Sequence, residues 1–248
     1  NNDPEVRKLW RKMNDWAERG MFETYAKLGA AFDKNYFESE FYTKGKEVVM
    51  EAFDKGQFER AENGAIVVPL QKFNLPDKPV IRGDGTSLYF TQDIYLAIQR
   101  FRDYPGLERI VYIVANEQEI HFRQLFATLK IMGVPQAEKC YHLGYGLLTL
   151  PTGKMSSRQG TVVNADDLLQ ELEQLALSEY DKRNPALGEE EIKRRSNVIA
   201  RAALMFYMVK QDAKKELVFD PQESISFDGQ TGPDLLYTAA LILIILKQ

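Results

Sequence analysis

Residues 83–94 combine a flexible turn with a phenol and a carboxylate that lie four positions apart. Their sequence is GDGTSLYFTQDI, in which Gly83 and Gly85 allow a tight turn. Tyr89 and Asp93 share a face if the backbone is helical there. A partly desolvated carboxylate beside a phenol is a good receptor for a planar cation, since a guanidinium donates two parallel hydrogen bonds to it. The alternative is that Asp93 only favours the start of a helix and that Tyr89 is an amphipathic core residue.

A second polar set lies in residues 116–126, NEQEIHFRQLF, at the start of an expected helix. Gln118 and His121 are three positions apart and face the same way. Gln118 is placed to hydrogen-bond a small ligand, and His121 can donate to a phosphate or ribose oxygen. The alternative for His121 is a structural hydrogen bond within the fold.

A third polar set lies in residues 153–160, GKMSSRQG, a loop bounded by glycines. Lys154, Ser156, Ser157 and Arg158 supply the cations and hydroxyl groups that hold phosphates. The alternative is a charged loop that is simply solvated.

The stretches before these sets have the pattern of an α/β fold. Apolar strands are expected over residues 80–82, 109–115 and 139–150. The helices between them have apolar faces at helical spacing, made by Ile94, Ala97, Ile98 and Phe101 and by Phe122, Leu125, Phe126 and Leu129. This alternation indicates a parallel sheet covered on both faces, half of a doubly wound nucleotide-binding fold. Ligands bind such sheets beyond the carboxyl ends of the strands, where the polar sets are expected.

Helices are expected on both sides of this sheet. The first 60 or so residues have apolar positions at helical spacing, and the stretches 65–70 and 72–82 predict short strands joined by a turn. The chain beyond about residue 165 is expected to be helical, with a long helix over roughly 189–215 and an apolar helix at the end.

The composition is that of a folded globular protein, with 44% hydrophobic and 27% charged residues. The formal net charge of −4 provides no global basic field, so any contact with RNA must be local. A single cysteine, Cys140, excludes an internal disulfide and favours a reducing compartment. Because His121 and His142 are the two histidines, no tightly bound metal is expected.

The ends of the sequence show no pattern of a signal peptide or a membrane span. The longest apolar run, Leu235–Leu246, has 12 residues, whereas about 18 to 20 are needed to cross a bilayer. We therefore expect a cytoplasmic protein that is not in the membrane. That run lies next to the last residue and there is no initiator methionine, so we expect a piece of a longer protein.

In this order the three polar sets resemble the catalytic domain of class I aminoacyl-tRNA synthetases, and specifically that of arginyl-tRNA synthetases. KMSSR at 154–158 resembles the Lys-Met-Ser-Lys-Ser signature of the class. DGTSLYFTQDI and NEQEIHFRQLF resemble the Asp-Gly-Thr-x-Leu-Tyr-x-Thr-x-Asp-Ile stretch and the Gln-x-x-His-Phe-x-Gln helix of the arginyl enzymes. FDKNYFESEFY and DGQTGPDLLY extend the similarity outward, so that it covers most of the chain.

The resemblance implies an α/β fold with a Rossmann-like parallel sheet, a mainly helical insertion before it and helices after it. Four ranges follow. Residues 1–78 would form a helical insertion, or connective region, with a short strand pair, and residues 79–165 the second half of the nucleotide-binding catalytic domain with the KMSSR loop. Residues 166–224 would form a helical connecting region, and residues 225–248 the start of a helical anticodon-binding domain.

The resemblance also implies roles for individual residues. Tyr89 and Asp93 would bind the guanidinium of arginine and Gln118 the amino-acid end of that substrate. Lys154 would stabilise the departing pyrophosphate, with Ser156 and Ser157 supporting the loop. Gly144 to Leu147 would pass along adenine, and the implied ATP-binding residues are His121, Gly144, Gly146, Leu147, Lys154, Met155 and Arg158.

The implied activity is that of an arginine–tRNA ligase, which uses ATP with Mg²⁺ to form arginyl-adenylate and transfers the arginyl group to tRNA(Arg). The expected partners are L-arginine, ATP and tRNA(Arg), and the expected state is a monomer. Three basic pairs, Lys182-Arg183, Arg194-Arg195 and Lys214-Lys215, can contact tRNA phosphates, although the acidic residues around them favour solvated helix faces.

Two departures from the family pattern leave alternatives open. Ser157 replaces the second lysine of the class signature, and the His-x-Gly-His signature does not occur in the 248 residues. Because the part of the site that carries the His-x-Gly-His signature is absent, we expect this chain by itself to be inactive. A catalytically inactive synthetase-like module that binds tRNA or nucleotide is one alternative, and another nucleotidyl-transferring enzyme of similar fold is a second.

Overall fold

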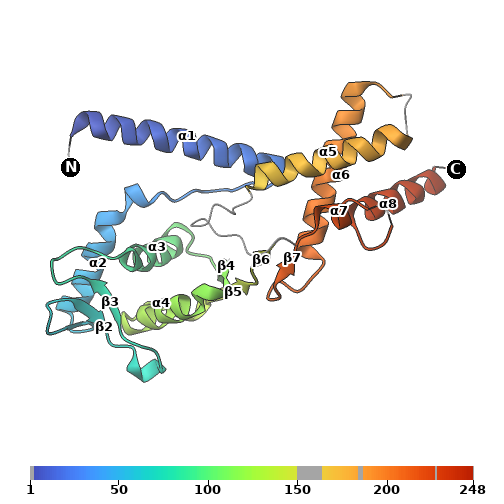
Figure 1. Ribbon diagram of the computed structural model, residues 1–248. Coiled ribbons are helices and arrows are strands. Elements are labelled where there is room, and N and C mark those ends of the chain that lie inside the picture. Colours follow the sequence, from blue (N-terminus) through green and yellow to red (C-terminus); the bar gives the residue numbers. More distant parts are fainter. Residues whose placement is uncertain (1–2, 150–163, 184–186, 227, 248) are drawn as a thin grey trace. The chain divides into compact units, whose positions relative to one another are not determined.

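The structure is a computed structural model, and it describes residues 3–149, 164–183, 187–226 and 228–247 (Figure 1). The chain divides into two compact units. One unit is Lys34–Gly146, and the other joins Asn1–Asp33 to Leu147–Gln248. Each unit is described by itself below.

The unit Lys34–Gly146 contains a small antiparallel sheet in the order β1-β2-β3. Its strands are β1 (Glu59–Arg60), β2 (Ile66–Val68) and β3 (Lys78–Ile81). The expectation that residues 80–82 form a strand of the parallel sheet is therefore wrong, because β3 pairs antiparallel with β2. The Asp77 carboxylate accepts a hydrogen bond from the backbone N–H of Leu70 at 2.8 Å, and this contact closes the connection that turns β3 back onto β2.

The same unit contains the expected parallel pair. Strand β4 (Ile110–Ala115) pairs with β5 (Cys140–Tyr145) in a register that runs from Ile110 opposite Cys140 to Ala115 opposite Tyr145. The connection between them holds the 3₁₀ turn η3 (Asn116–Gln118), helix α4 (Glu119–Ile131) and the turn η4 (Ala137–Lys139). Two parallel strands joined through a helix form a βαβ unit, the building block of a Rossmann-like fold.

One face of the parallel pair packs against helices and the other is open. Tyr112 and Val114 join the hydrophobic core of the unit, whereas Ile113 is 67% exposed. Val111 and Tyr141 are also exposed. Coverage of both faces, which we expected from the apolar strands, is thus not found in the part of the chain that the structure describes.

The two predicted amphipathic helices beside this pair are confirmed. In α3 (Tyr89–Asp103) and α4 the residues expected on the apolar faces pack into one core, except Phe101, which is buried outside it. Ile94, Ala97, Leu125 and Leu129 are fully buried there. Helix α2 (Tyr42–Asp54) crosses α3 closely, because an added Cβ at Gly45 would lie 2.7 Å from the carbonyl oxygen of Thr91.

Cys140 lies half-buried at the start of β5. Burial raises the pKa of its thiol to about 11. The thiol is therefore protonated near neutral pH. Because a cysteine reacts as its thiolate, little of the reactive form of Cys140 is present there.

The other unit is mainly helical. It contains α1 (Pro4–Leu28), α5 (Ala165–Arg183), α6 (Glu189–Val209), α7 (Pro221–Ser224) and α8 (Gly232–Leu246). A short parallel pair joins β6 (Leu148–Thr149) to β7 (Leu217–Val218). Two sequence expectations change here: β6 separates from β5, and the helix expected to reach about residue 215 ends at Val209.

The chain turns after α6 because local polar contacts replace helical ones. The Asp212 carboxylate accepts a hydrogen bond from the backbone N–H of Lys214 at 2.8 Å. The N–H of Leu217 then donates to the carbonyl of Leu147 at 3.0 Å, which begins the pairing of β7 with β6.

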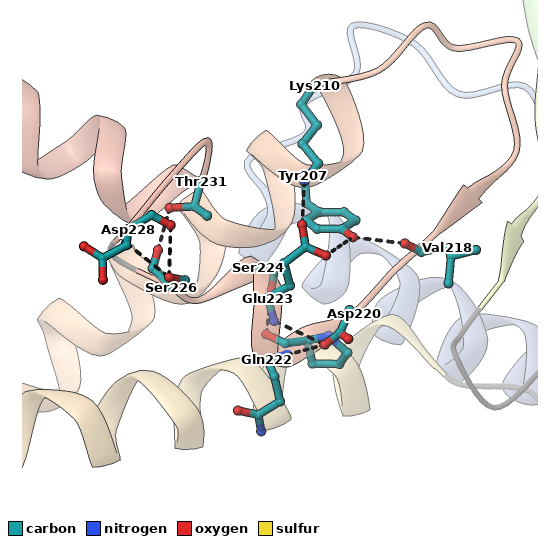
Figure 2. A network of polar contacts seen from close by, with 11 residues as sticks. Tyr207, Lys210, Val218, Asp220, Gln222, Glu223, Ser224, Ser226, Asp228 and Thr231 are labelled. Carbon is teal, nitrogen blue, oxygen red and sulfur yellow. Dashed lines mark hydrogen bonds and ion pairs between the residues drawn. The ribbon is translucent and has the colours of Figure 1, made fainter.

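Figure 2 shows how the segment after β7 is fastened to α6. The Tyr207 hydroxyl lies 3.1 Å from both the Val218 carbonyl oxygen and the Glu223 carboxylate. The Lys210 ammonium lies 3.3 Å from the other oxygen of the Glu223 carboxylate. Asp220 caps the N-terminus of α7 in the same network. These contacts fix a loop that a polar, glycine-containing sequence alone does not specify.

Both terminal helices of this unit carry exposed apolar side chains. Helix α1 begins at an Asp3 cap and ends at Gly29 in the left-handed conformation, with φ of 73°. Its residues Val6, Leu9, Trp10, Met13 and Trp16 have the predicted helical spacing, yet each is between 51% and 59% exposed. Among the described residues, no helix is both long and apolar enough to span a membrane.

The four domain ranges given above remain a prediction. The boundary at residue 78 coincides with the first residue of β3, and the compact unit Lys34–Gly146 continues across it. Compactness and the limits of a domain in a family are different criteria for dividing a chain.

Replacing Gly45 by Ala should destabilise the protein through the α2–α3 contact. Overpacking against a backbone carbonyl costs about 1–3 kcal/mol, and the better helix propensity of alanine returns about 1 kcal/mol at most. A lower midpoint of thermal unfolding is expected for the complete protein encoded by the gene. The control is Gly106→Ala, because nothing lies within 4 Å of an added Cβ there. Equal midpoints for both variants would contradict the close crossing.

The last turn of α3 should make stability depend on acidic pH. Hydrogen bonds from Lys34, Tyr36 and Gln99 lower the pKa of Asp103 to about 2. This contribution is fully present above the unfolded pKa of about 3.9, and it is lost as the pH falls towards the folded value.

Asp103→Asn should therefore lower the unfolding free energy at pH 6, and the deficit should shrink by pH 3. Urea unfolding of wild type and variant at the two pH values measures this difference. A deficit that is the same at both values would show that the carboxylate charge is not the source.

Candidate substrate-binding site

The turn before α3 brings the first functional residues into a helix. Gly85 has φ of 82°, a value that favours glycine, and the Asp84 carboxylate accepts the N–H of Thr86 at 2.9 Å. Gly83 packs against the carbonyl oxygen of Asn63, where an added Cβ has no room. The predicted tight turn is confirmed, and α3 begins directly afterwards at Tyr89.

Tyr89 and Asp93 lie one helical turn apart, and His121 of α4 contacts both. The Nε2 atom of His121 lies 3.0 Å from Oδ2 of Asp93. The imidazole ring stacks on the Tyr89 ring, with centroids 5.8 Å apart and planes 13° apart. Residues from two of the predicted polar sets therefore meet at one place.

These three side chains differ in exposure. Tyr89 is 64% exposed, so the interpretation of this residue as part of the core is wrong. The Asp93 side chain is 37% exposed and that of His121 only 12%. The site thus presents a phenol and a carboxylate to solvent over a mostly buried imidazole.

Gln118 lies near this group without a hydrogen bond to it. It is the last residue of η3 and the N-cap of α4, one turn before His121, and it is exposed. Among the hydrogen bonds of the described residues, none joins its side chain to Tyr89 or Asp93. Its predicted role depends on a ligand that reaches along the start of α4.

The glycine segment at the end of β5 has a close neighbour that the sequence analysis missed. Gly144 is buried, and its Cα faces the side-chain oxygen of Asn116, which would meet an added Cβ. His142 stacks on Phe122 with centroids 4.6 Å apart, and its Nε2 lies 2.9 Å from the Val114 carbonyl oxygen. The signal for Asn116 was its position directly after β4, at the carboxyl end of a parallel strand.

The remaining predicted residues are placed less completely. Gly146 and Leu147 follow β5, and the division between the compact units falls between them. Lys154, Met155, Ser156, Ser157 and Arg158 lie outside the described residues. Their roles stay predictions.

Metal-ligating groups and one of the predicted basic pairs can be assessed in the part of the chain that the structure describes. Within the described ranges, no group of three or more His, Cys, Asp or Glu side chains is arranged to hold a metal ion. Arg194 and Arg195 both pair with Glu191, at 2.8 Å and 2.7 Å, and they lower the pKa of that carboxyl to about 2. These ion pairs favour the interpretation of Arg194-Arg195 as part of a solvated helix face.

Comparison with known families decides the relationship of the chain. The model of the family "tRNA synthetases class I (R), catalytic domain" matches residues 1–221. The chain belongs to this family. The family resemblance stated from the three polar sets is thereby confirmed.

Curated relatives match nearly the whole chain. Arginine–tRNA ligase of Treponema pallidum is 44% identical over an alignment of 250 positions, which covers 99% of this chain and 42% of that protein. Arginine–tRNA ligase of Flavobacterium psychrophilum is 46% identical over 247 residues, which are 99% of this chain and 41% of that protein. The chain therefore spans about two fifths of the length of these relatives.

Solved structures confirm the fold class of this family member. Arginyl-tRNA synthetase of Plasmodium falciparum superposes with a TM-score of 0.82 at 20% identity, covering 100% of this chain and 42% of that one. Arginyl-tRNA synthetase of Thermus thermophilus gives a TM-score of 0.76 at 24% identity, covering 99% of this chain and 50% of that one. The α/β, Rossmann-like prediction is confirmed by these neighbours.

Proposed function

We propose that this chain contributes the arginine-recognition part of an arginine–tRNA ligase. The observation that carries the proposal is the convergence of Tyr89, Asp93 and His121 in a member of the class I (R) family. The names of the curated relatives support the same activity.

The site chemistry fits the guanidinium of arginine. Asp93 offers carboxylate oxygens to two parallel N–H donors, and Tyr89 adds an exposed phenol one turn away on the same helix. Gln118, exposed at the start of the neighbouring helix, is assigned to the amino-acid end of the substrate. A flat cation with several donors satisfies this pair better than an ammonium does.

Discrimination against lysine follows from unmet hydrogen bonds. An ammonium group cannot donate in parallel to both oxygens of one carboxylate while also satisfying a neighbouring phenol. Each polar group that the wrong substrate desolvates and leaves unpaired penalises that substrate by about 1–3 kcal/mol. The pair therefore acts as a specificity filter before any chemistry occurs.

ATP, with Mg²⁺ on its phosphates, is assigned to the segment from Gly144 to Leu147 and to the KMSSR loop. The position of Gly144 supports this assignment, because it lies at the carboxyl end of the parallel strand β5, where such sheets bind ligands. Lys154 is assigned to the leaving pyrophosphate, Ser156 and Ser157 to the support of the loop, and Met155 and Arg158 to nucleotide contacts.

The reaction has two steps. A carboxylate oxygen of arginine attacks the α-phosphorus of ATP, the bond to the bridging oxygen breaks, and pyrophosphate leaves. A terminal ribose hydroxyl of tRNA(Arg) then attacks the arginyl carbonyl and displaces AMP. Both steps depend on positioning and charge neutralisation rather than on a covalent enzyme intermediate.

The proposal includes a monomeric enzyme in the cytoplasm. A single cysteine, Cys140, supports a reducing compartment because such compartments do not maintain disulfides.

The test is arginine-dependent exchange between ATP and pyrophosphate, run with and without tRNA on the complete protein encoded by the gene. Asp93→Asn should raise the KM for arginine by about tenfold or more, because a charged acceptor of the guanidinium is lost. The KM for ATP should change little. Asp54→Asn is the matched control, since it removes the same charge from an exposed position at the end of α2.

A normal KM for arginine in Asp93→Asn would remove Asp93 from the binding site. Exchange that depends on another amino acid would contradict the arginine assignment. Absence of exchange with retained binding of tRNA or nucleotide would favour the catalytically inactive module instead.

A further inference from the structure

His121 is the one residue among the described contacts that touches both members of the guanidinium-binding pair. Its Nε2 atom meets Oδ2 of Asp93 at 3.0 Å, and its ring lies against that of Tyr89 at 5.8 Å. The contact joins two helices, since Asp93 belongs to α3 and His121 to α4. One side chain can therefore set the position of both ligand-facing groups.

The surroundings of His121 hold its ring in one orientation. Phe90 and Phe122 meet the imidazole edge-on, with centroids 5.2 Å and 5.4 Å away and planes at 87° and 75°. With Tyr89 stacked on it, the ring has aromatic neighbours on three sides. An imidazole packed in this way cannot rotate towards a ligand without displacing its neighbours.

The burial of His121 argues against direct contact with a nucleotide. Its side chain is 12% exposed, whereas that of Asp93 is 37% exposed. A substrate that reaches this surface meets Tyr89 and Asp93 first. The imidazole lies behind them, which suits a supporting role.

The protonation of the contact follows from the acceptor. An ionised carboxylate can only accept, so Nε2 of His121 carries the proton and donates it to Oδ2 of Asp93. The Oδ1 atom and the second lone pair of Oδ2 remain for a guanidinium, because a carboxylate has about four acceptor positions. The hydrogen bond from His121 thus orients the Asp93 carboxylate and leaves acceptor positions on both of its oxygens for the ligand.

We propose that His121 is a positioning residue, which holds Asp93 and Tyr89 in the geometry that receives the guanidinium and does not bind ATP. This inference rests on the proposed function for the identity of the ligand. It replaces the expectation that His121 lies near ATP.

Two substitutions separate the contacts of His121. His121→Phe keeps a ring among the aromatic neighbours but removes the donor to Asp93. His121→Gln keeps an N–H donor of similar reach but removes the ring. Isothermal titration of the complete protein with L-arginine, and separately with ATP, measures the two affinities without requiring activity.

His121→Phe should weaken arginine binding about tenfold, the loss expected for one hydrogen bond to a charged group, and should leave ATP binding unchanged. His121→Gln should lie between this variant and the wild type. In an Asp93→Asn background, His121→Phe should cause almost no further loss, because the two residues act as one unit.

Other results would overturn the inference. Weaker ATP binding with normal arginine binding would make His121 a nucleotide ligand. Additive losses in the double variant, or equal losses for both ligands with a lowered unfolding midpoint, would show a general structural role. Exchange activity of the wild type is scored separately, so an inactive protein whose arginine binding still follows this pattern would refute only the ligase function.

Discussion

Parallel strands cannot be joined by a tight turn, and the candidate site depends on this constraint. The pairing of β4 with β5 requires a crossover, which α4 provides. Because α4 begins just beyond the carboxyl end of β4, His121 lies in its first turn at the edge where ligands bind such sheets. The recognition chemistry is therefore a consequence of strand direction.

Helix α3 supplies the other half of the site and is positioned from both ends. At its start, Gly45 lets α2 approach the backbone of Thr91, two residues from Asp93. At its end, Asp103 accepts hydrogen bonds from Lys34, Tyr36 and Gln99, so the incoming chain is tied to the last turn. These contacts hold the two ends of α3, and the contact with His121 joins α3 to α4 beside their shared hydrophobic core.

Elements with strong periodicity could be predicted from the sequence. The buried faces of α3 and α4 follow the helical repeat of large apolar residues, and β4 is a continuous apolar run flanked by helices. Which strands pair with each other could not be predicted in the same way. The stretch that contains Val80 and Ile81 is apolar in either sheet, and its antiparallel pairing depends on the Asp77 contact seven residues from Leu70.

The site was predictable in part, for a related reason. Local spacing placed Tyr89 beside Asp93 on one helix, and it placed Gln118 just before the helix that holds His121. The contact between His121 and Asp93 spans 28 positions and depends on how two helices pack. Likewise, helical spacing in α1 predicted a helix correctly but not that Trp10 and Trp16 are exposed.

The protonated thiol of Cys140 has a practical consequence for spectroscopy. The sequence contains no other cysteine, and a thiol with a pKa of about 11 reacts slowly with maleimides at neutral pH. A cysteine introduced at an exposed position of α3 would consequently react faster than Cys140. Dyes and spin labels would then be attached preferentially to the introduced cysteine rather than to Cys140.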